Sequence, residues 1–127
     1  MNGEDSLREL AEVFKALNDE TRLRILKLLE NESLSVCEIM EVLGMIQSRV
    51  SRHLDILRRA GFLTAQRDKK WVIHSWNRER VNPYHLPLQE MLRLWLNDNK
   101  RVKEDKKRLQ QVKAMNIREK GEKVRLG

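Results

Sequence analysis

The most informative pattern in the chain is a helical repeat of apolar residues over 47–60. Val50, Leu54 and Leu57 recur at three- and four-residue spacing, which places them on one face of an amphipathic α-helix. Gly61 follows as a helix terminator. The opposite face and its edges carry Gln47, Ser48, Arg49, Ser51, Arg52, Asp55 and Arg59. The pattern predicts a helix that packs on a core with one face and presents polar and arginine side chains with the other.

A shorter helix is predicted just before this one. Ser35 and Glu38 have the spacing of a capping box, in which each side chain bonds the backbone N–H of the other residue. Gly44 can adopt the left-handed conformation that ends a helix. Two helices joined by a short turn, the second with an arginine-bearing outer face, describe a helix-turn-helix. The second helix of that motif enters the major groove of DNA.

Two strand-like runs follow the second helix, at residues 62–66 and 71–76. Between them, Arg67-Asp68-Lys69-Lys70 forms a polar turn with three positive charges. A β-hairpin directly after a recognition helix is the wing of a winged helix. The predicted fold class is therefore mainly α with a small β-hairpin, a winged helix-turn-helix.

Three linked motifs resemble the ArsR/SmtB family of bacterial transcriptional regulators. They are LNDETRLRIL at 17–26, VSRHL at 50–54 with LRRAG at 57–61, and WVIHS at 71–75. The resemblance extends roughly from Leu7 to Met91, with the motifs in the family's order and spacing. It implies a sequence-specific DNA-binding regulator, a homodimeric repressor that binds an inverted-repeat operator in double-stranded DNA. It also implies dimerisation through the N- and C-terminal helices.

The N-terminal segments are predicted to be helical. Ser6 begins a second capping-box pattern and opens a helix that runs through Leu17. Asn18-Asp19 caps the next helix, which supplies core residues. Arg22 and Arg24 lie on that helix, behind the DNA-binding motif, so we expect them to be structural or solvated.

The C-terminal segments are predicted to form one long helix. Asn82-Pro83 breaks the preceding pattern, and Pro87 can begin the helix. Its wide apolar stripe, which must be covered, consists of Leu88, Met91, Leu92, Trp95 and Leu96. A helical extension is expected to about Ala114. We therefore divide the chain into a DNA-binding and dimerisation domain over 1–99 and a charged helical extension with a basic tail over 100–127.

The net charge of +7 is unevenly distributed along the 127 residues. Residues 1–46 carry a net charge of −5, 47–80 carry +6, 81–99 carry −1 and 100–127 carry +7. The +6 block coincides with the predicted recognition helix and wing, as expected for a surface that binds a polyanion. The chain has no long apolar run and no signal-like start, so we expect a soluble, cytoplasmic protein without a membrane partner.

The candidate DNA contacts fall into two groups. Those on the recognition helix are Gln47, Ser48, Arg49, Ser51, Arg52 and His53, and those on the wing are Arg67, Lys69 and Lys70. Arginine can bond guanine O6 and N7 together, glutamine can bond adenine in the same way, and serine near a helix start suits phosphate oxygens. The alternatives are a solvated helix face for the first group and a solvated turn for the second.

One position departs from the family pattern, because Ile46 stands where Ser or Thr usually caps the recognition helix. That loses a cap worth about 1 kcal/mol unless Gln47 or Ser48 replaces it. The histidines carry weaker signals. His53 either donates to a phosphate or packs at the boundary of the core, His74 is expected to be structural, and His85 has no obvious partner.

Cys37 is the only cysteine, which excludes an intrachain disulfide and a cysteine-cluster zinc site. Arsenic-responsive relatives often carry Cys-x-Cys here, but this chain reads Ser35-Val36-Cys37. The family's other site uses Asp and His on the last helix, where this chain has Asp98 but no histidine after His85. We therefore predict no metal and no cofactor, and keep Cys37 as a weak candidate thiol sensor beside its alternative, an inert helix cysteine.

Two other classes of function were weighed against DNA-binding regulation. An enzyme is not expected, because a glycine-rich loop, a paired-carboxylate site and a cysteine–histidine arrangement are all lacking. A winged-helix protein-interaction module that does not read DNA sequence is the alternative, with the apolar last helix docking a different partner. The basic block over helix and wing favours DNA, although charge alone leaves RNA open.

Overall fold

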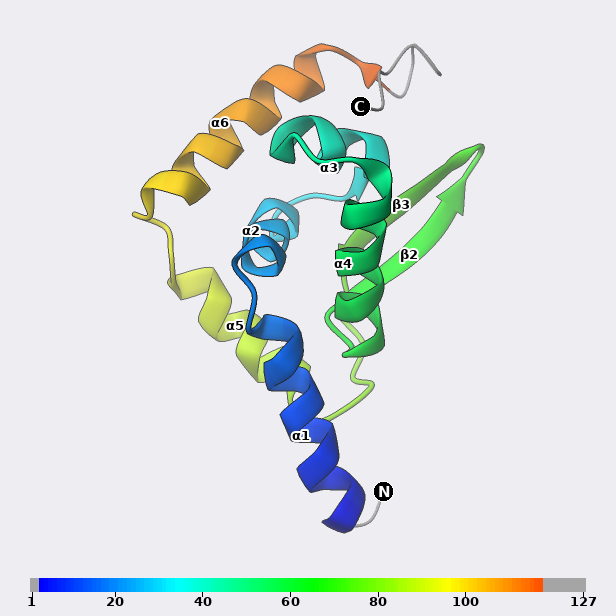
Figure 1. Cartoon of the computed structure of the whole chain (residues 1–127), viewed down its shortest axis with the longest axis vertical. Coiled ribbons are helices and arrows are strands. Elements are labelled where there is room, and N and C mark those ends of the chain that lie inside the picture. Colours follow the sequence, from blue (N-terminus) through cyan, green and yellow to red (C-terminus); the bar gives the residue numbers. More distant parts are fainter. Residues whose placement is uncertain (1–2, 118–127) are drawn as a thin grey trace.

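The computed structural model describes residues 3–117, which form six helices and one three-stranded sheet (Figure 1). In chain order the elements are α1 (Gly3–Leu17), α2 (Glu20–Leu29), β1 (Leu34–Ser35), α3 (Val36–Leu43), α4 (Gln47–Arg59), β2 (Leu63–Asp68), β3 (Trp71–Trp76), α5 (His85–Leu94) and α6 (Lys100–Ala114). The predicted fold class, mainly α with a winged helix-turn-helix, is confirmed.

The two N-terminal helices begin differently from each other. The capping box expected at Ser6 is wrong, because α1 already begins at Gly3 and Ser6 lies inside it. The cap expected at Asp19 is confirmed, since its carboxylate accepts a hydrogen bond from the Arg22 N–H at 3.0 Å. An N-cap needs the non-helical backbone that Asp19 has, so the Ser-x-x-Glu spacing alone does not locate a helix start.

The core surrounds α2. Ile25, Leu26 and Leu29 are almost completely buried, and α1, α4, α6 and strand β3 pack against this helix. The Trp76 indole N–H donates to the Leu26 carbonyl at 2.8 Å and fixes the sheet against α2. Burial of these side chains supplies the main driving force that holds the helix-turn-helix in place.

The hairpin is longer and its turn tighter than the sequence indicated. Strand β2 extends to Asp68, which pairs with Trp71, so the turn consists only of Lys69 and Lys70. Lys69 has φ = 60°, the left-handed conformation that a two-residue hairpin turn requires. A short third strand, β1, pairs with β3 in the strand order β1-β3-β2.

The single long C-terminal helix that we predicted is wrong. Helix α5 begins two residues before Pro87 and ends at Leu94, and α6 folds back over α2 and α3 (Figure 1). At the break, Leu96 has φ = 68°, and the Asn99 side chain caps α6 by accepting from the Val102 N–H at 3.0 Å. Helix α6 ends at Ala114, as expected, and the basic tail at 118–127 lies outside the described residues.

A buried lysine joins α2 to the break between the last two helices. Lys27 is 1% exposed, and its Nζ donates to Glu30 Oε1 at 2.7 Å, to the Leu92 carbonyl at 2.7 Å and to Asn97 Oδ1 at 3.0 Å. Three acceptors satisfy all three N–H donors of the ammonium group, which makes its burial tolerable. These bonds join α2 to the last turn of α5 and to the segment that follows it.

Candidate nucleic-acid interface

The geometry of the helix-turn-helix follows from its caps. Ser35 Oγ accepts from the Glu38 N–H at 3.2 Å, and Glu38 Oε1 accepts from the Ser35 N–H at 2.8 Å, so the predicted capping box is confirmed. Gly44 ends α3 with φ = 67°. Ile46 takes the N-cap position of α4 without a side-chain cap, as the sequence indicated.

Helix α4 divides sharply into a buried and an exposed face. Val50, Leu54 and Leu57 are at most 2% exposed, which confirms the predicted inward face. The exposed candidates are Gln47, Ser48, Arg49, Ser51 and Arg52. Within residues 3–117, none of these five side chains makes a hydrogen bond or ion pair, so their polar groups are available to a ligand.

The C-terminal half of α4 is electrostatically different. The Asp55 carboxylate pairs with Arg58 and, at 3.0 Å, with Arg59. These contacts offset part of the positive charge in the last two turns. Among residues 3–117, Arg49 and Arg52 are therefore the cations of the helix that have no ion pair, and they lie in the half that a recognition helix directs at base edges.

His53 lies where α4 meets the first two helices. An Arg22 N–H contacts His53 Nδ1 at 3.1 Å, and the same guanidinium donates from Nε to the Ala16 carbonyl at 2.7 Å. Because arginine only donates, Nδ1 must accept, and the ring proton resides on Nε2. The boundary packing considered for His53 is thus present. Its Nε2–H is the group left to donate outward.

The pKa of His53 is lowered from its usual value of 6.5. Burial is the largest cause, and Asp19 opposes it. Nearby guanidinium groups lower the pKa further, and they belong to Arg22, Arg49 and Arg52. The imidazole is therefore neutral at pH 7 in the free protein, in agreement with its role as acceptor from Arg22.

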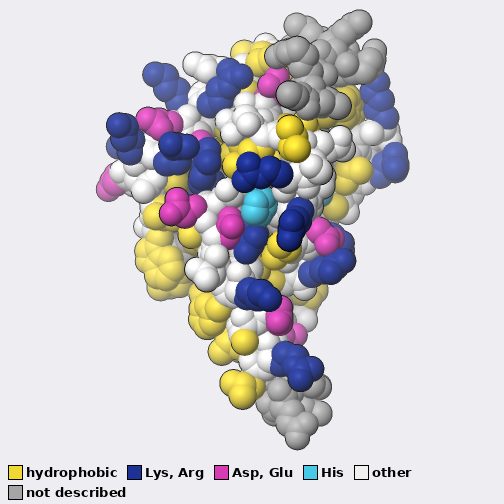
Figure 2. Space-filling model, in the orientation of Figure 1, with side chains coloured by type: hydrophobic (Ala, Val, Ile, Leu, Met, Phe, Trp, Pro, Cys, Tyr) yellow, Lys and Arg dark blue, Asp and Glu magenta, His cyan; other side chains and the backbone are white. Residues whose placement is uncertain are grey.

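The three basic side chains of the wing are exposed. Arg67 was expected in the turn, but it lies in strand β2, where it pairs with Val72. Lys69 and Lys70 form the tip, and Lys70 Nζ lies 5.5 Å from the centroid of the Trp71 ring. Figure 2 shows lysine and arginine side chains gathered over α4, over the wing and again over α6.

Comparison with known proteins agrees with this geometry. Residues 19–65 match the family model described as "Bacterial regulatory protein, arsR family". The HTH-type transcriptional regulator MJ1325 of Methanocaldococcus jannaschii is 46% identical over 78 residues, which are 61% of this chain and 88% of that protein. The arsenic resistance transcriptional regulator ArsR2 of Pseudomonas putida is 41% identical over 69% of this chain and 80% of its own length. The chain belongs to the ArsR family.

The solved structures give the same fold. The homodimeric winged helix-turn-helix DNA-binding domain of Mb0332 from Mycobacterium bovis matches with a TM-score of 0.61 at 24% identity, over 74% of this chain and 85% of that one. About a quarter of this chain therefore has no counterpart in that domain. Together with the relatives, the match makes the protein a DNA-binding transcriptional regulator of the ArsR family.

The other histidines of this ArsR-family regulator are structural. His85, expected to lack partners, is in fact fully buried; its Nε2 accepts from the Val81 N–H at 3.2 Å, and its Nδ1 contacts Gln89 Oε1. His74 is buried in β3, as expected. Its Nδ1 has no hydrogen-bond partner in the described part of the chain. The partners of His85 are backbone and amide groups, so no sequence motif marks them.

Cys37 lies half-buried on α3. Burial, followed by the charges of Glu38 and Glu41, raises the pKa of its thiol. A protonated thiol is a weak metal ligand and a slow nucleophile. Residues 3–117 contain no group of three or more histidine, cysteine or carboxylate side chains placed to hold a metal ion.

Within residues 3–117, no helix is long and apolar enough to cross a membrane.

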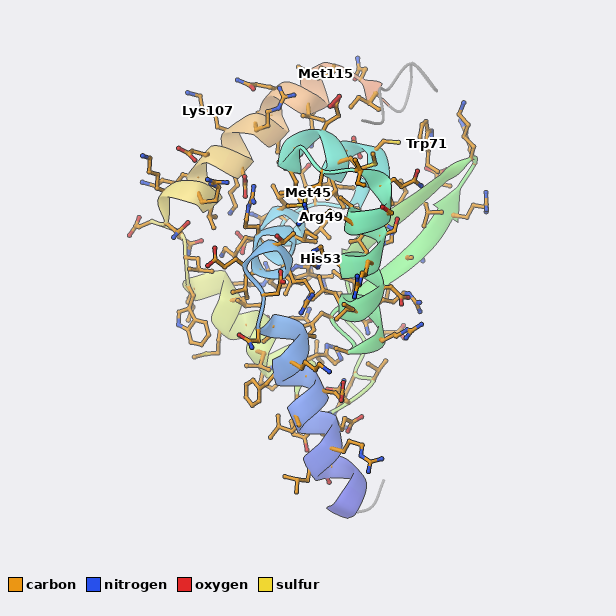
Figure 3. All side chains as sticks on the ribbon, in the orientation of Figure 1. Met45, Arg49, His53, Trp71, Lys107 and Met115 are labelled. Carbon is orange, nitrogen blue, oxygen red and sulfur yellow. The ribbon has the colours of Figure 1, made fainter. Side chains whose placement is uncertain are left out.

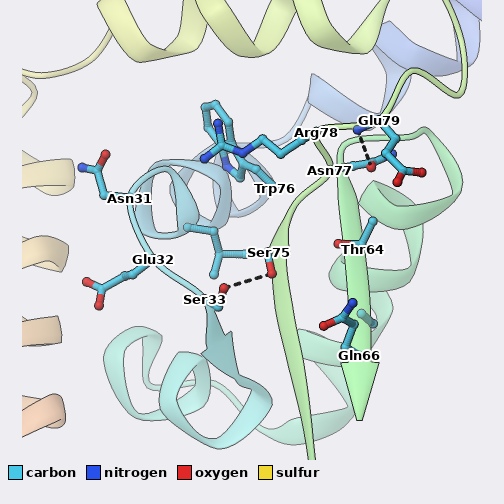
Figure 4. Close-up of a pocket in the computed structure, with 12 residues that line it drawn as sticks. Asn31, Glu32, Ser33, Thr64, Gln66, Ser75, Trp76, Asn77, Arg78 and Glu79 are labelled. Carbon is cyan, nitrogen blue, oxygen red and sulfur yellow. Dashed lines mark hydrogen bonds between the residues drawn. The ribbon is translucent and has the colours of Figure 1, made fainter. Parts of the chain in front are cut away.

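The structure also contains a polar groove that the sequence did not indicate. It measures about 630 Å³ and lies between the α2–β1 loop and the outer sides of β2 and β3 (Figure 4). Ser33 Oγ, on the loop, donates to Ser75 Oγ, on β3, at 3.0 Å. None of the nine candidate DNA contacts lines this groove.

Proposed function

We propose that this protein is a homodimeric repressor that occupies an inverted-repeat operator in double-stranded DNA. The observation that carries the proposal is the division of α4 into an apolar buried face and an exposed face whose polar groups, at positions 47–52, have no partner within residues 3–117. In a winged helix-turn-helix, that helix enters the major groove. Repression then results from occupancy of the promoter, in the cytoplasm where the DNA lies, without a catalytic step.

The residues of the two elements have different roles in this proposal. Arg52, Arg49 and Gln47 bond base edges in the major groove, because their side chains can make paired hydrogen bonds to guanine or adenine. Ser48 and Ser51 near the helix start, and His53 through Nε2–H, donate to phosphate oxygens. Arg67, Lys69 and Lys70 contact the backbone or minor groove from the wing, which fixes orientation without specifying sequence.

The proposed dimer uses α1 and α5. Both helices expose large apolar side chains, of which Phe14 and Leu94 are 53% and 73% exposed. Figure 2 shows hydrophobic side chains gathered along the edge formed by these helices. The M. bovis domain of the same fold is homodimeric. A two-fold axis there would place two α4 helices about one DNA turn apart, which requires an inverted repeat.

The experiment separates sequence recognition from general attraction. DNA bound by the wild-type protein is selected from a randomised pool, and its affinity is compared with that of a scrambled duplex. Arg52→Ala should reduce the difference between the two duplexes by about 1–3 kcal/mol per half-site, which is the discrimination that a paired arginine–guanine contact supplies. Lys69→Asn should weaken both duplexes alike and lower the salt slope by roughly 0.9 per lost phosphate contact.

Asparagine is chosen at position 69 because it tolerates the left-handed backbone there. Arg80→Gln, in the loop between β3 and α5, removes one exposed charge outside α4, the wing and the helices of the proposed dimer, and serves as the control. A loss of specificity in Lys69→Asn, with none in Arg52→Ala, would reverse the assigned roles. A wild-type protein that selects no sequence would instead favour the protein-interaction module.

A further inference from the structure

Helix α6 is held to the body of the protein by specific contacts. The Asp105 carboxylate accepts two hydrogen bonds from the Arg24 guanidinium, at 2.8 and 3.0 Å. The further ion pairs that attach the helix are Lys106–Glu30 and Lys113–Glu32. Its buried apolar residues are Val102, Leu109 and Val112. These contacts give α6 a defined position, so the charges on its outer face have a fixed arrangement.

The outer face of α6 carries a stripe of lysines, which we call the α6 stripe: Lys100, Lys103 and Lys107. Their spacing of three and four residues places them in one row, about 10 Å long at 1.5 Å per residue. Figure 3 shows Lys107 directed away from the body of the protein. The two acidic residues of the helix are engaged by Arg24 and Arg101. Within residues 3–117 no ion pair neutralises the stripe.

The position of α6 relative to the helix-turn-helix makes this charge significant. Helix α3 lies between α4 and α6 and packs against both (Figure 1). In a helix-turn-helix complex the first helix crosses the DNA backbone while the second enters the groove. A duplex bound by α4 and crossed by α3 therefore continues toward α6.

We propose that the α6 stripe binds the phosphate backbone of DNA that flanks the operator, outside the base pairs contacted by α4 and the wing. This inference rests on the proposed function. The exposed surface of α6 has no large apolar side chain, so it lacks the aromatic and aliphatic anchors on which protein partners depend. Phosphates require only fixed cations, and a row of about 10 Å spans roughly three base-pair steps.

The test uses the triple variant Lys100→Gln, Lys103→Gln and Lys107→Gln. Two duplexes carry the operator selected by the wild-type protein, one trimmed at the outer edges of the half-sites and one extended by ~10 base pairs on each side, a full helical turn. On the extended duplex the variant should bind at least about tenfold more weakly, with a salt slope lower by roughly 0.9 per lost contact. On the trimmed duplex it should match the wild-type protein, with its base preference unchanged.

Two controls make the result specific. The corresponding triple Lys→Arg variant should restore binding to the extended duplex, because it keeps the three charges. The double variant Arg78→Gln, Arg80→Gln, which removes two exposed charges from the loop between β3 and α5, should leave the effect of the flanks intact. Equal weakening on both duplexes, or no weakening on either, would overturn the inference. Failure of the wild-type protein to select DNA would count against the proposed function itself.

Discussion

At the scale of single residues, His74 makes stability depend on pH. Its pKa is lowered from 6.5, first by burial and then by the nearby Arg58. Above pH 6.5 the imidazole is neutral in both the folded and the unfolded chain. As the pH falls below 6.5, the unfolded chain takes up a proton before the folded one does, so stability decreases until the lowered folded pKa is reached.

We therefore expect the free energy of unfolding in urea to be lower at pH 5.5 than at pH 7.5. A single histidine contributes at most about 1.4 kcal/mol per pH unit in this window. His74→Gln should flatten the dependence in part, because the lowered pKa of His53 gives a second contribution of the same sign. A dependence of unchanged steepness in His74→Gln would show that other groups are responsible.

A second residue-scale prediction concerns Ile46. Its backbone has the extended conformation of an N-cap, at φ = −72° and ψ = 159°, but its side chain offers no acceptor to the first turn of α4. Because the side chain is half exposed, little apolar burial is lost on replacement. Ile46→Ser should raise the free energy of unfolding by about 1 kcal/mol. Ile46→Ala, which removes the isoleucine without adding an acceptor, is the matched control and should show no gain.

Local sequence predicted the residues whose partners are near in the chain. The capping box of Ser35 and Glu38 is a contact within one helical turn, and the inward face of Val50, Leu54 and Leu57 can be identified from helical spacing alone. The roles of Lys27 and His85 did not follow from the sequence. Lys27 bonds groups 65 and 70 residues away, and only the folded chain brings them together.

At the scale of elements, the attachment of α6 depends most on Asp105. Its side chain is 7% exposed and accepts both bonds from Arg24. Asp105→Asn leaves Arg24 with one neutral acceptor at best, and hydrogen bonds to charged groups contribute about 1.5–3 kcal/mol each. We expect the free energy of unfolding to fall by about 2 kcal/mol, and amide hydrogen exchange in α6 to accelerate.

Glu104→Gln provides the comparison for this prediction. Glu104 is 55% exposed and 3.5 Å from Arg101, and an exposed pair of this kind contributes at most about 0.5 kcal/mol. If both variants lose the same stability, the Arg24–Asp105 pair is not what holds the helix. The break before α6 had a local signal that the helical periodicity outweighed in our prediction. Residues 88–96 have helical periodicity, but the chain turns at Asn97-Asp98-Asn99, residue types that favour turns and caps.

At the scale of the whole molecule, the apolar stripe predicted for one helix proved to serve two surfaces. Leu92 faces the core, whereas Met91, Trp95 and Leu96 are exposed. Periodicity identified a face that must be covered, but the division between core and exterior depends on where α5 ends. Lys27 holds that end against α2 through bonds to groups 65 and 70 residues away, which periodicity cannot indicate.

The exposed apolar surface of α1 and α5 leads to the last prediction. Leu94 and Trp95 are 73% and 49% exposed, and contiguous apolar surface of this kind marks an interaction site. Leu94→Glu with Trp95→Glu places four like charges at a two-fold interface, since each substitution occurs twice. We expect sedimentation to show a dimer for the wild-type protein at micromolar concentration and a monomer for the variant. The variant should also bind a full operator no more tightly than a single half-site, because the second α4 is no longer linked to the first.

The control for this prediction is Gln110→Glu, which adds an acidic group on α6 outside the apolar surface and should leave the protein dimeric. A wild-type monomer, or a variant that remains dimeric, would place the subunit contact elsewhere. A wild-type protein that is monomeric yet binds a different apolar partner through α5 would support the protein-interaction alternative.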